Sequence, residues 1–300
     1  MWRRRYWDVA LRLATSSSTS ADVGDPISTN QDLGGGLAPK TIWLDRAYAT
    51  FKPINEVSVT GGKFGVPYHF TDLQFDPDLN LEGIVVGAQG MNKEAVVTPF
   101  GRLGGYWVQE RSTGPDQALF GAQIGASLKQ DRITLTGAAA YYDYSNVKNS
   151  PTLFSITKSF GNTDIDDLYA YDYNLIDVNL LFKYKLDNVE ASLLGNYIQN
   201  MDPDSENTAW LAGATLKGKG LFEWDFGYNY RVLEADAVIG AFTDSDFGGG
   251  GTNAEGHRIW GGITPVKNTR LGVTWFVNQR DPDGSDIHYE RLMADLEVKF

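Results

Sequence analysis

Polar and apolar side chains alternate along fourteen separate segments of this chain, and helical periodicity is almost absent. In the clearest segment, 221–236, aromatic residues occupy every second position between polar ones. Successive side chains of a β-strand point to opposite faces, so each segment predicts a strand with one apolar and one polar face. Purely apolar sequence is too scarce to fill the core of a soluble domain. The pattern therefore predicts a transmembrane antiparallel up-and-down β-barrel, with lipid outside and water within.

The links between these segments alternate in length. Short turns follow every second strand, and longer links lie between them, three of which contain Asp-Pro-Asp. Outer-membrane barrels have short periplasmic turns and longer external loops, so both termini are expected on the periplasmic side. The expected strands lie near 4–16, 41–52, 56–66, 81–90, 94–111, 118–130, 132–146, 173–186, 188–200, 207–219, 221–236, 255–266, 269–280 and 286–300.

Length and composition agree with one barrel. The 300 residues contain no linker or change of rhythm, which predicts a single domain over 1–300. No run approaches the ~20 apolar residues of a membrane helix. The net charge of -12 argues against a nucleic-acid partner. Residues 2–12 are too charged for the apolar part of a signal peptide, so we expect numbering that starts after processing or a chain truncated at its start.

Five stretches near the start resemble a family of outer-membrane porins of Gram-negative bacteria: 10–15 (ALRLAT), 28–36 (STNQDLGGG), 42–48 (IWLDRAY), 61–65 (GGKFG) and 71–83 (TDLQFDPDLNLEG). The resemblance implies a water-filled channel in outer-membrane lipid and lipopolysaccharide, built as a homotrimer of sixteen-stranded barrels. The terminal Phe300 resembles the aromatic residue by which the barrel-assembly machinery recognises its clients.

The chain departs from this family in its strand count, because only fourteen strands are visible. Either two strands are missing from the start or the barrel is smaller. With two missing, 68–80 becomes the third external loop, which in general porins folds inward and narrows the pore. The predicted constriction then sets three carboxylates of that loop opposite basic residues of the early strands. Its residues are Asp72, Asp76, Asp78, Arg12, Arg46, Lys63 and Arg102.

Charges on the polar faces should control what passes, since carboxylates favour cations and basic side chains favour anions. The acidic loops and the net charge favour passive diffusion of ions and small hydrophilic solutes with a weak preference for cations. The late strands are expected to contribute six residues to the lumen: Glu223, Asp225, Arg231, Arg291, Asp295 and Glu297.

Tryptophans near strand ends could be platforms for sugars or anchors at the lipid interface, and the anchor interpretation is favoured for most of them. Trp7, Trp107, Trp210 and Trp275 belong to this group. Trp43 and Trp260, whose strand neighbours are less clearly apolar, are candidates for the lumen.

Catalytic and metal-binding patterns are scarce. The three histidines, His69, His257 and His288, lack metal-ligand spacing, and no Gly-x-Ser-x-Gly motif is present. We therefore predict no enzyme activity, no cofactor and no metal centre. The turn with Asp281, Asp283 and Asp286 has oxygen ligands of the kind calcium prefers, but Leu292 stands where an EF-hand has glutamate. A solvated hairpin turn is the favoured interpretation, with a weak calcium site as the alternative.

Two other functions are compatible with the sequence. An outer-membrane hydrolase would need His257 or His288 beside Ser245 or Ser285. A structural or adhesive barrel would have a plugged lumen, with 147–172 and 239–254 as candidate plugs.

Overall fold

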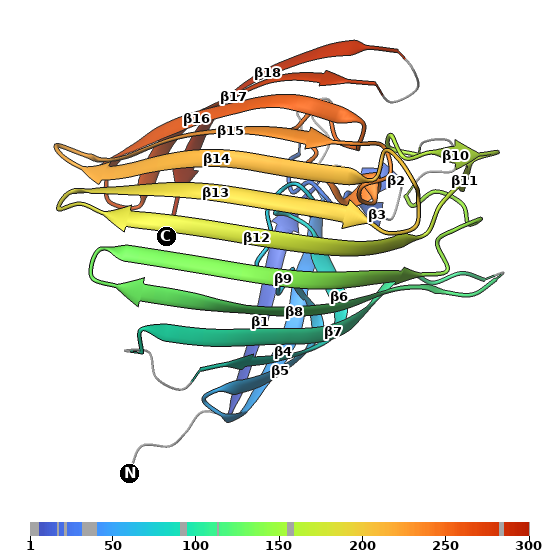
Figure 1. Ribbon diagram of the computed structural model, residues 1–300, viewed down its shortest axis with the longest axis horizontal. Helices are drawn as coiled ribbons and strands as arrows, with labels where there is room; N and C mark the ends of the chain where they lie inside the picture. The colour runs from blue at the N-terminus through green and yellow to red at the C-terminus, as the bar shows by residue number, and fades with distance from the viewer. Residues whose placement is uncertain are drawn as a thin grey trace.

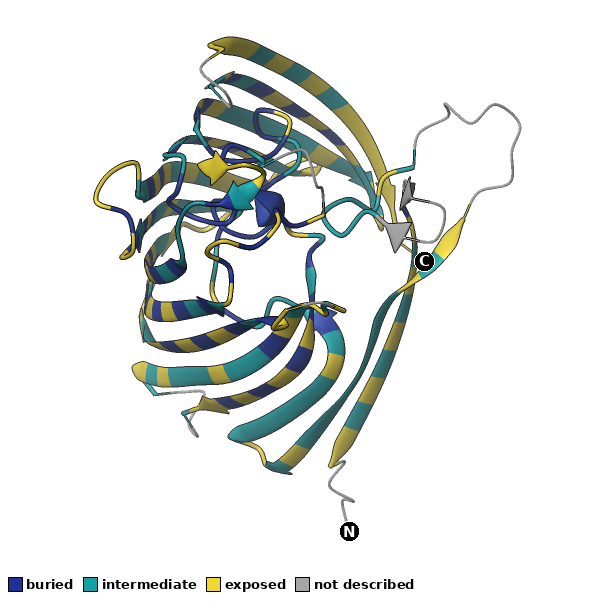
Figure 2. Ribbon diagram, turned by 90° about the vertical axis from the view of Figure 1, so that its right-hand side faces the viewer, coloured by how far each residue is buried: buried dark blue, intermediate teal, exposed yellow. Residues whose placement is uncertain are grey.

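The computed structural model describes residues 6–16, 18–20, 23–31, 41–90, 95–112, 114–154, 159–281 and 285–299. Fourteen antiparallel strands form one sheet that curves into the wall of a barrel (Figures 1 and 2). Every strand pairs with the next strand of this sheet along the chain, and the order runs from β1 to β18. The strands are β1 (Trp7–Thr15), β4 (Ile42–Ile54), β5 (Val57–Gly65), β6 (Asn80–Gln89), β7 (Val97–Gln109), β8 (Gln117–Gln130), β9 (Ile133–Ser145), β12 (Tyr173–Lys185), β13 (Val189–Asn200), β14 (Thr208–Lys219), β15 (Glu223–Leu233), β16 (Ala254–Val266), β17 (Thr269–Arg280) and β18 (Ile287–Val298).

The predicted strands are confirmed, and each boundary lies within three residues of its expected position. The remaining elements belong to the long links. They are the hairpins β2 (Ser18–Ser20) with β3 (Val23–Gly24) and β10 (Asp164–Ile165) with β11 (Leu168–Tyr169), and the 3-10 turn η1 (Gly240–Phe242). Among the described residues, no helix is long and apolar enough to cross a membrane.

The apolar faces of the strands point outward. On β12, Ile176, Val178 and Leu180 are 40%, 47% and 52% exposed, whereas Asp177 and Asn179 are buried on the opposite face. Lipid can solvate exposed aliphatic side chains, but it cannot solvate carboxylates. The strand therefore has the inside-out pattern that its sequence predicts.

The chain enters and leaves the sheet at the same rim of the barrel, the one that carries the short turns. Trp7 pairs with Phe51 close to the turn after β4, and Val298 pairs with Thr269 just after the turn that precedes β17. The long links emerge at the opposite end, where three of them turn back into the barrel (Figure 2). Loops thus enter the barrel from the long-link end, whereas wall and turn side chains line a pocket at the short-turn end.

Candidate pore lumen

The loop between β5 and β6 folds inward and lies against the far wall. The His69 amide donates to Oε1 of Gln123, and Nε2 of Gln123 donates back to the His69 carbonyl, both at 2.8 Å. Asn179 on β12 also donates to this carbonyl, at 3.4 Å. These bonds hold residues 66–79 to the inner face of β8 and β12, and the expected inward loop is present.

Aromatic packing holds the same loop. Tyr68 lies edge-to-face with Tyr106 and Tyr142, at ring-centroid distances of 6.2 and 5.2 Å. The Tyr106 hydroxyl donates to the Tyr68 hydroxyl at 2.9 Å, and Tyr68 donates to the Gly121 carbonyl. Each such ring pair contributes about 0.5–1.5 kcal/mol beyond its buried area. Burial, more than the hydrogen bond and Arg102 can offset, raises the pKa of Tyr68 to about 12, so its hydroxyl stays protonated.

A second long link docks on this loop, and a third long link docks on the second. The Asp76 amide donates to the Phe242 carbonyl at 2.7 Å, and the Ser245 amide donates to Oδ2 of Asp76 at 2.9 Å. Asn162 donates to the carbonyls of Ala235 and Val238. Residues 66–79, 146–154, 159–172 and 234–253 therefore form one packed unit inside the barrel, which we call the loop layer.

A buried cation fixes the loop layer to the wall. The Arg231 guanidinium, fully buried on β15, donates to Oδ2 of Asp72 at 3.0 Å and to Oδ2 of Asp244 at 3.2 Å. Arg258 on β16 donates to the same Asp72 oxygen at 2.5 Å. The Phe247 ring covers Arg231, with its centroid 4.2 Å from the guanidinium carbon. Two loops and two strands therefore meet at one cluster of charges.

The pKa values of the carboxyl groups in and beside this cluster are shifted in different directions. Burial alone would raise the pKa of Asp72, but Arg231 and Arg258 outweigh it and hold that pKa below its usual range. Burial raises the pKa of Asp244 to about 6, against the pull of Arg231. Burial also raises the pKa of Asp76 to about 7, although two backbone amides bind its oxygens. Asp72 is therefore the carboxyl that neutralises the arginines.

The predicted constriction is assembled differently from the expectation. Asp72, Asp76 and Asp78 do enter the lumen, but Asp72 meets Arg231 and Arg258, and Asp78 accepts hydrogen bonds from Thr29. These three carboxyl groups are anchors of the loop layer. The sequence did not single out Arg258, although its alternation with Trp260 on β16 could have identified it.

The basic residues of the early strands form a separate group. Arg12 pairs with Asp45, and Arg46 donates to Asn80, which in turn donates to Asp45. Arg102 lies on the inner face in register with the buried Gln123.

The prediction that Lys63 faces the lumen is wrong. It lies on the outer face, where it pairs in register with Glu82 on the same face as Ile84, which is 56% exposed. The next residue, Phe64, takes the inner position and packs edge-to-face on Tyr48 and Tyr106. The expectation failed because the inner wall is apolar beneath the loop layer.

The six residues expected in the lumen on the late strands all lie on inward faces. Arg291 pairs with Asp246 at 2.7 Å, and Asp225 pairs with Arg270 at 2.8 Å. On β18, Leu292 and Leu296 are 71% and 66% exposed on the outer face, which leaves Arg291, Asp295 and Glu297 on the inner one.

The tryptophans divide as expected. Trp43 and Trp260 lie on inner faces, in register with Ala14 and Gly227. The four proposed anchors lie on the outer wall, and Trp7, Trp107, Trp210 and Trp275 are 58%, 64%, 40% and 40% exposed.

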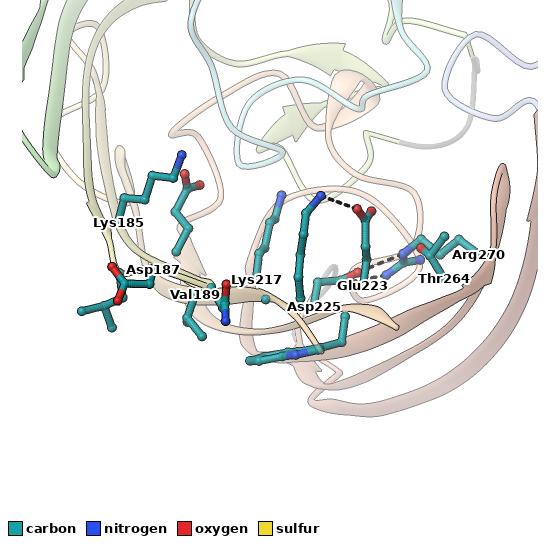
Figure 3. A pocket seen from close by; sticks show the side chains of 14 residues that line it. Lys185, Asp187, Val189, Lys217, Glu223, Asp225, Thr264 and Arg270 are labelled. Atoms are coloured by element: carbon teal, nitrogen blue, oxygen red, sulfur yellow. Dashed lines mark hydrogen bonds and ion pairs between the residues drawn. The ribbon is translucent and has the colours of Figure 1, made fainter. Parts of the chain in front are cut away.

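A charged cavity of about 590 Å³ lies at the short-turn end between β12 and β17, and we call it the inner basin (Figure 3). Its wall contains eight charged side chains of both signs. Arg270 donates to both carboxylate oxygens of Asp225, at 3.0 and 2.8 Å. The charged lining residues are Lys185, Asp187, Glu190, Lys217, Lys219, Glu223, Asp225 and Arg270.

Two glycines let Arg270 lie flat along this wall. A Cβ atom at Gly262 or Gly272 would lie 2.4 or 2.5 Å from the Arg270 guanidinium. Asp225, Gly262 and Gly272 are neighbours in register across three strands, so Arg270 crosses the glycines to reach Asp225. The glycines thus hold this cation against the barrel wall.

We expect Gly272→Leu to push Arg270 off the wall, separate it from Asp225 and move its charge into the lumen. The reversal potential in a KCl gradient should then shift toward anion preference relative to the unmodified protein. Gly195→Leu is the matched control, because a Cβ there meets no atom within 4 Å. An equal shift in both variants would contradict this role of the glycines.

Hydrolase geometry is not assembled among the described histidines and serines. His257 lies on the outer face, where its Nδ1 is 2.9 Å from the Tyr228 hydroxyl. Ser245 lies in the loop layer and donates to the Ile27 carbonyl. His69 packs against Phe100 in the lumen, with the two rings tilted by 38°, and burial together with Arg102 lowers the pKa of His69.

The candidate calcium site and the predicted C-terminal assembly signal both include residues that the structure does not describe. Asp283 and Phe300 fall outside the described residues. Among the residues that are described, including Asp281 and Asp286, no three His, Asp or Glu side chains are grouped to hold a metal ion.

An antiparallel sheet with an apolar outside, a charged inside and inward loops defines an outer-membrane β-barrel of the channel type. A family model described as "Putative porin" matches residues 4–173 and 162–300. The chain belongs to this porin family, and its place is the outer membrane.

Solved structures share the fold. The outer-membrane channel DcaP of Acinetobacter baumannii is 12% identical, with 98% of this chain and 80% of that chain covered and a TM-score of 0.52. Wzi of Escherichia coli, a carbohydrate-binding β-barrel involved in group 1 capsule assembly, is 13% identical, with 98% and 74% covered and a TM-score of 0.57. OprB of Pseudomonas putida is 13% identical, with 86% and 73% covered and a TM-score of 0.55. No curated protein matches the chain.

Proposed function

We propose that the protein is a channel for passive diffusion of ions and small hydrophilic solutes. The inner basin carries this proposal, because its exposed charged side chains line the lumen where no loop of the loop layer contacts them. A barrel of this strand number is wide enough for an aqueous path. In the proposed orientation the short-turn end and both termini face the periplasm, and the loop layer faces outward.

Single-channel recording in planar bilayers tests the proposal. The detergent-purified protein should give stable conductance steps of roughly nanosiemens size, as expected for an aqueous pore. Steps in triplets would support the homotrimer that we also propose. Silent bilayers containing correctly folded protein would contradict the channel.

A weak cation preference is the second part of the proposal, supported by the net charge of -12. Asp72, Asp76 and Asp78 are unsuitable carriers because all three are bound in the loop layer. Asp295 and Glu297, both exposed on the inner face of β18, are better candidates. Neutralising these two should move the reversal potential toward zero, and an unchanged potential would exclude them.

We keep lipopolysaccharide, membrane lipid and the barrel-assembly machinery as proposed partners, the last through Phe300. A plugged structural barrel is the second candidate function, favoured by the extensive packing of the loop layer. Conductance distinguishes it from the channel, since a plugged barrel stays silent until the layer undocks.

A further inference from the structure

We propose that the inner basin binds a small extended solute that carries a negative charge at each end. This goes beyond diffusion, because binding can be measured whether or not the channel conducts. The basin's size suits such a ligand, since small-molecule sites usually measure about 300–1,000 Å³.

Every carboxylate that lines the basin already has a cationic partner. Asp187 pairs with Arg132 at 3.0 Å and Glu190 with Lys183 at 3.7 Å. Glu223 pairs with Lys219 at 2.6 Å, and Asp225 with Arg270 at 2.8 Å. The negative charge of the wall is therefore balanced by its own neighbours.

Two cations of the lining remain. Lys185 and Lys217 form no ion pair with any described residue, and Figure 3 shows both side chains rising from the wall into the cavity. Asp187 and Glu190 are neutralised by Arg132 and Lys183, which lie outside the lining, and the other two carboxylates are neutralised within it. With these partners counted, the ammonium groups of Lys185 and Lys217 are a surplus of positive charge. A ligand with anionic groups would complete the pairing.

The register sets the spacing of the two ammonium groups. Lys185, Glu190 and Lys217 are in register on β12, β13 and β14. Two strand spacings place the lysine Cα atoms about 10 Å apart. Glu190 lies between them and repels a single anionic centre placed midway. A solute with two separated anionic ends and an uncharged middle meets one lysine at each end and avoids this repulsion.

Calorimetric titration of the detergent-purified full chain tests the proposal, with glutarate as the probe and pentanoate as the singly charged analogue. Glutarate should bind at least about tenfold more tightly, and its affinity should fall with rising salt. Lys185→Gln and Lys217→Gln should each weaken binding about threefold, and together about tenfold, as expected for exposed ion pairs. Lys148→Gln, in the loop layer and outside the lining of the basin, is the control and should bind normally.

Reversing the charges gives a second readout. A Lys185→Glu, Lys217→Glu variant should reject glutarate and bind pentane-1,5-diamine. Equal affinity for glutarate and pentanoate, tighter binding of inorganic phosphate than of glutarate, or unchanged glutarate binding by the double Gln variant would each overturn the proposal. Silent bilayers with intact glutarate binding would contradict the channel function alone.

Discussion

Arg231→Met is expected to release the loop layer from the barrel wall. The substitution removes the cation between Asp72 and Asp244; Asp72 keeps Arg258, but Asp244 is left as a buried carboxylate with no cationic partner among the described residues. Breaking a buried ion pair from one side costs about 3–5 kcal/mol, because the remaining charge is uncompensated. Limited proteolysis should therefore cut within 234–253 much faster than in the unmodified protein, and conductance should rise as the loops leave the lumen.

Two comparisons isolate the cause. Arg291→Met breaks a pair with Asp246 whose side chains are 37% and 25% exposed, so we expect a loss of at most about 1 kcal/mol and little change in proteolysis. Adding Asp244→Asn to Arg231→Met removes the orphaned charge, while Asp72 keeps its partner Arg258, and should restore much of the protection. Equal cleavage of the Arg231 and Arg291 variants would refute a special role for the buried cation.

Docking of the loop layer is expected to weaken as pH rises from about 4 to 7. Burial raises the pKa of Asp76 to about 7 and that of Asp244 to about 6. In this pH range the undocked carboxyls ionise first, so the docked state binds more protons and loses stability with rising pH. For Asp76, which is 5% exposed, the full change is about 4 kcal/mol. The lowered pKa of Asp72 acts in the opposite sense, and its contribution is lost only at still lower pH.

The cleavage rate of 234–253, normalised to that of an unstructured peptide at each pH, measures this dependence. The rate should be higher at pH 8 than at pH 5. Asp76→Asn keeps the shape of the side chain but cannot ionise, so most of the pH dependence should disappear. A pH profile unchanged by Asp76→Asn would show that another group controls docking.

Alternation predicted the wall because each strand has its own pattern and needs no partner to be recognised. Ile176, Val178 and Leu180 face outward as expected, and so does the aromatic face of β15. Reading the polar face of each strand as the inner face assumes that water fills the barrel. The prediction failed where the loop layer replaces that water. Beside the loop layer the inner wall carries Phe64 and Tyr106, so the apolar neighbour of Lys63 points inward and the lysine outward.

The partners of the site residues could not be read from the sequence. Asp72 was expected opposite Arg12 and Arg46, yet it crosses the barrel to Arg231 and Arg258. The surplus charge of Lys185 and Lys217 emerges only after every nearby carboxylate is assigned a partner in three dimensions. Single strands reveal which face a residue occupies, whereas these pairings depend on how fourteen strands are registered.

The reach of the loop layer has a consequence for the order of assembly. Asp72 bonds to Arg258, 186 positions further along the chain, and Thr71 bonds to Asn196, 125 positions away. Contacts between residues so distant form late, because the chain entropy of closing large loops must be lost first. Residues 66–79 can dock on β8 and β12 as soon as those strands have joined the wall. The charge cluster around Asp72 cannot close until β15 and β16 have followed, so the inner lining is locked in place only after most of the barrel wall has formed.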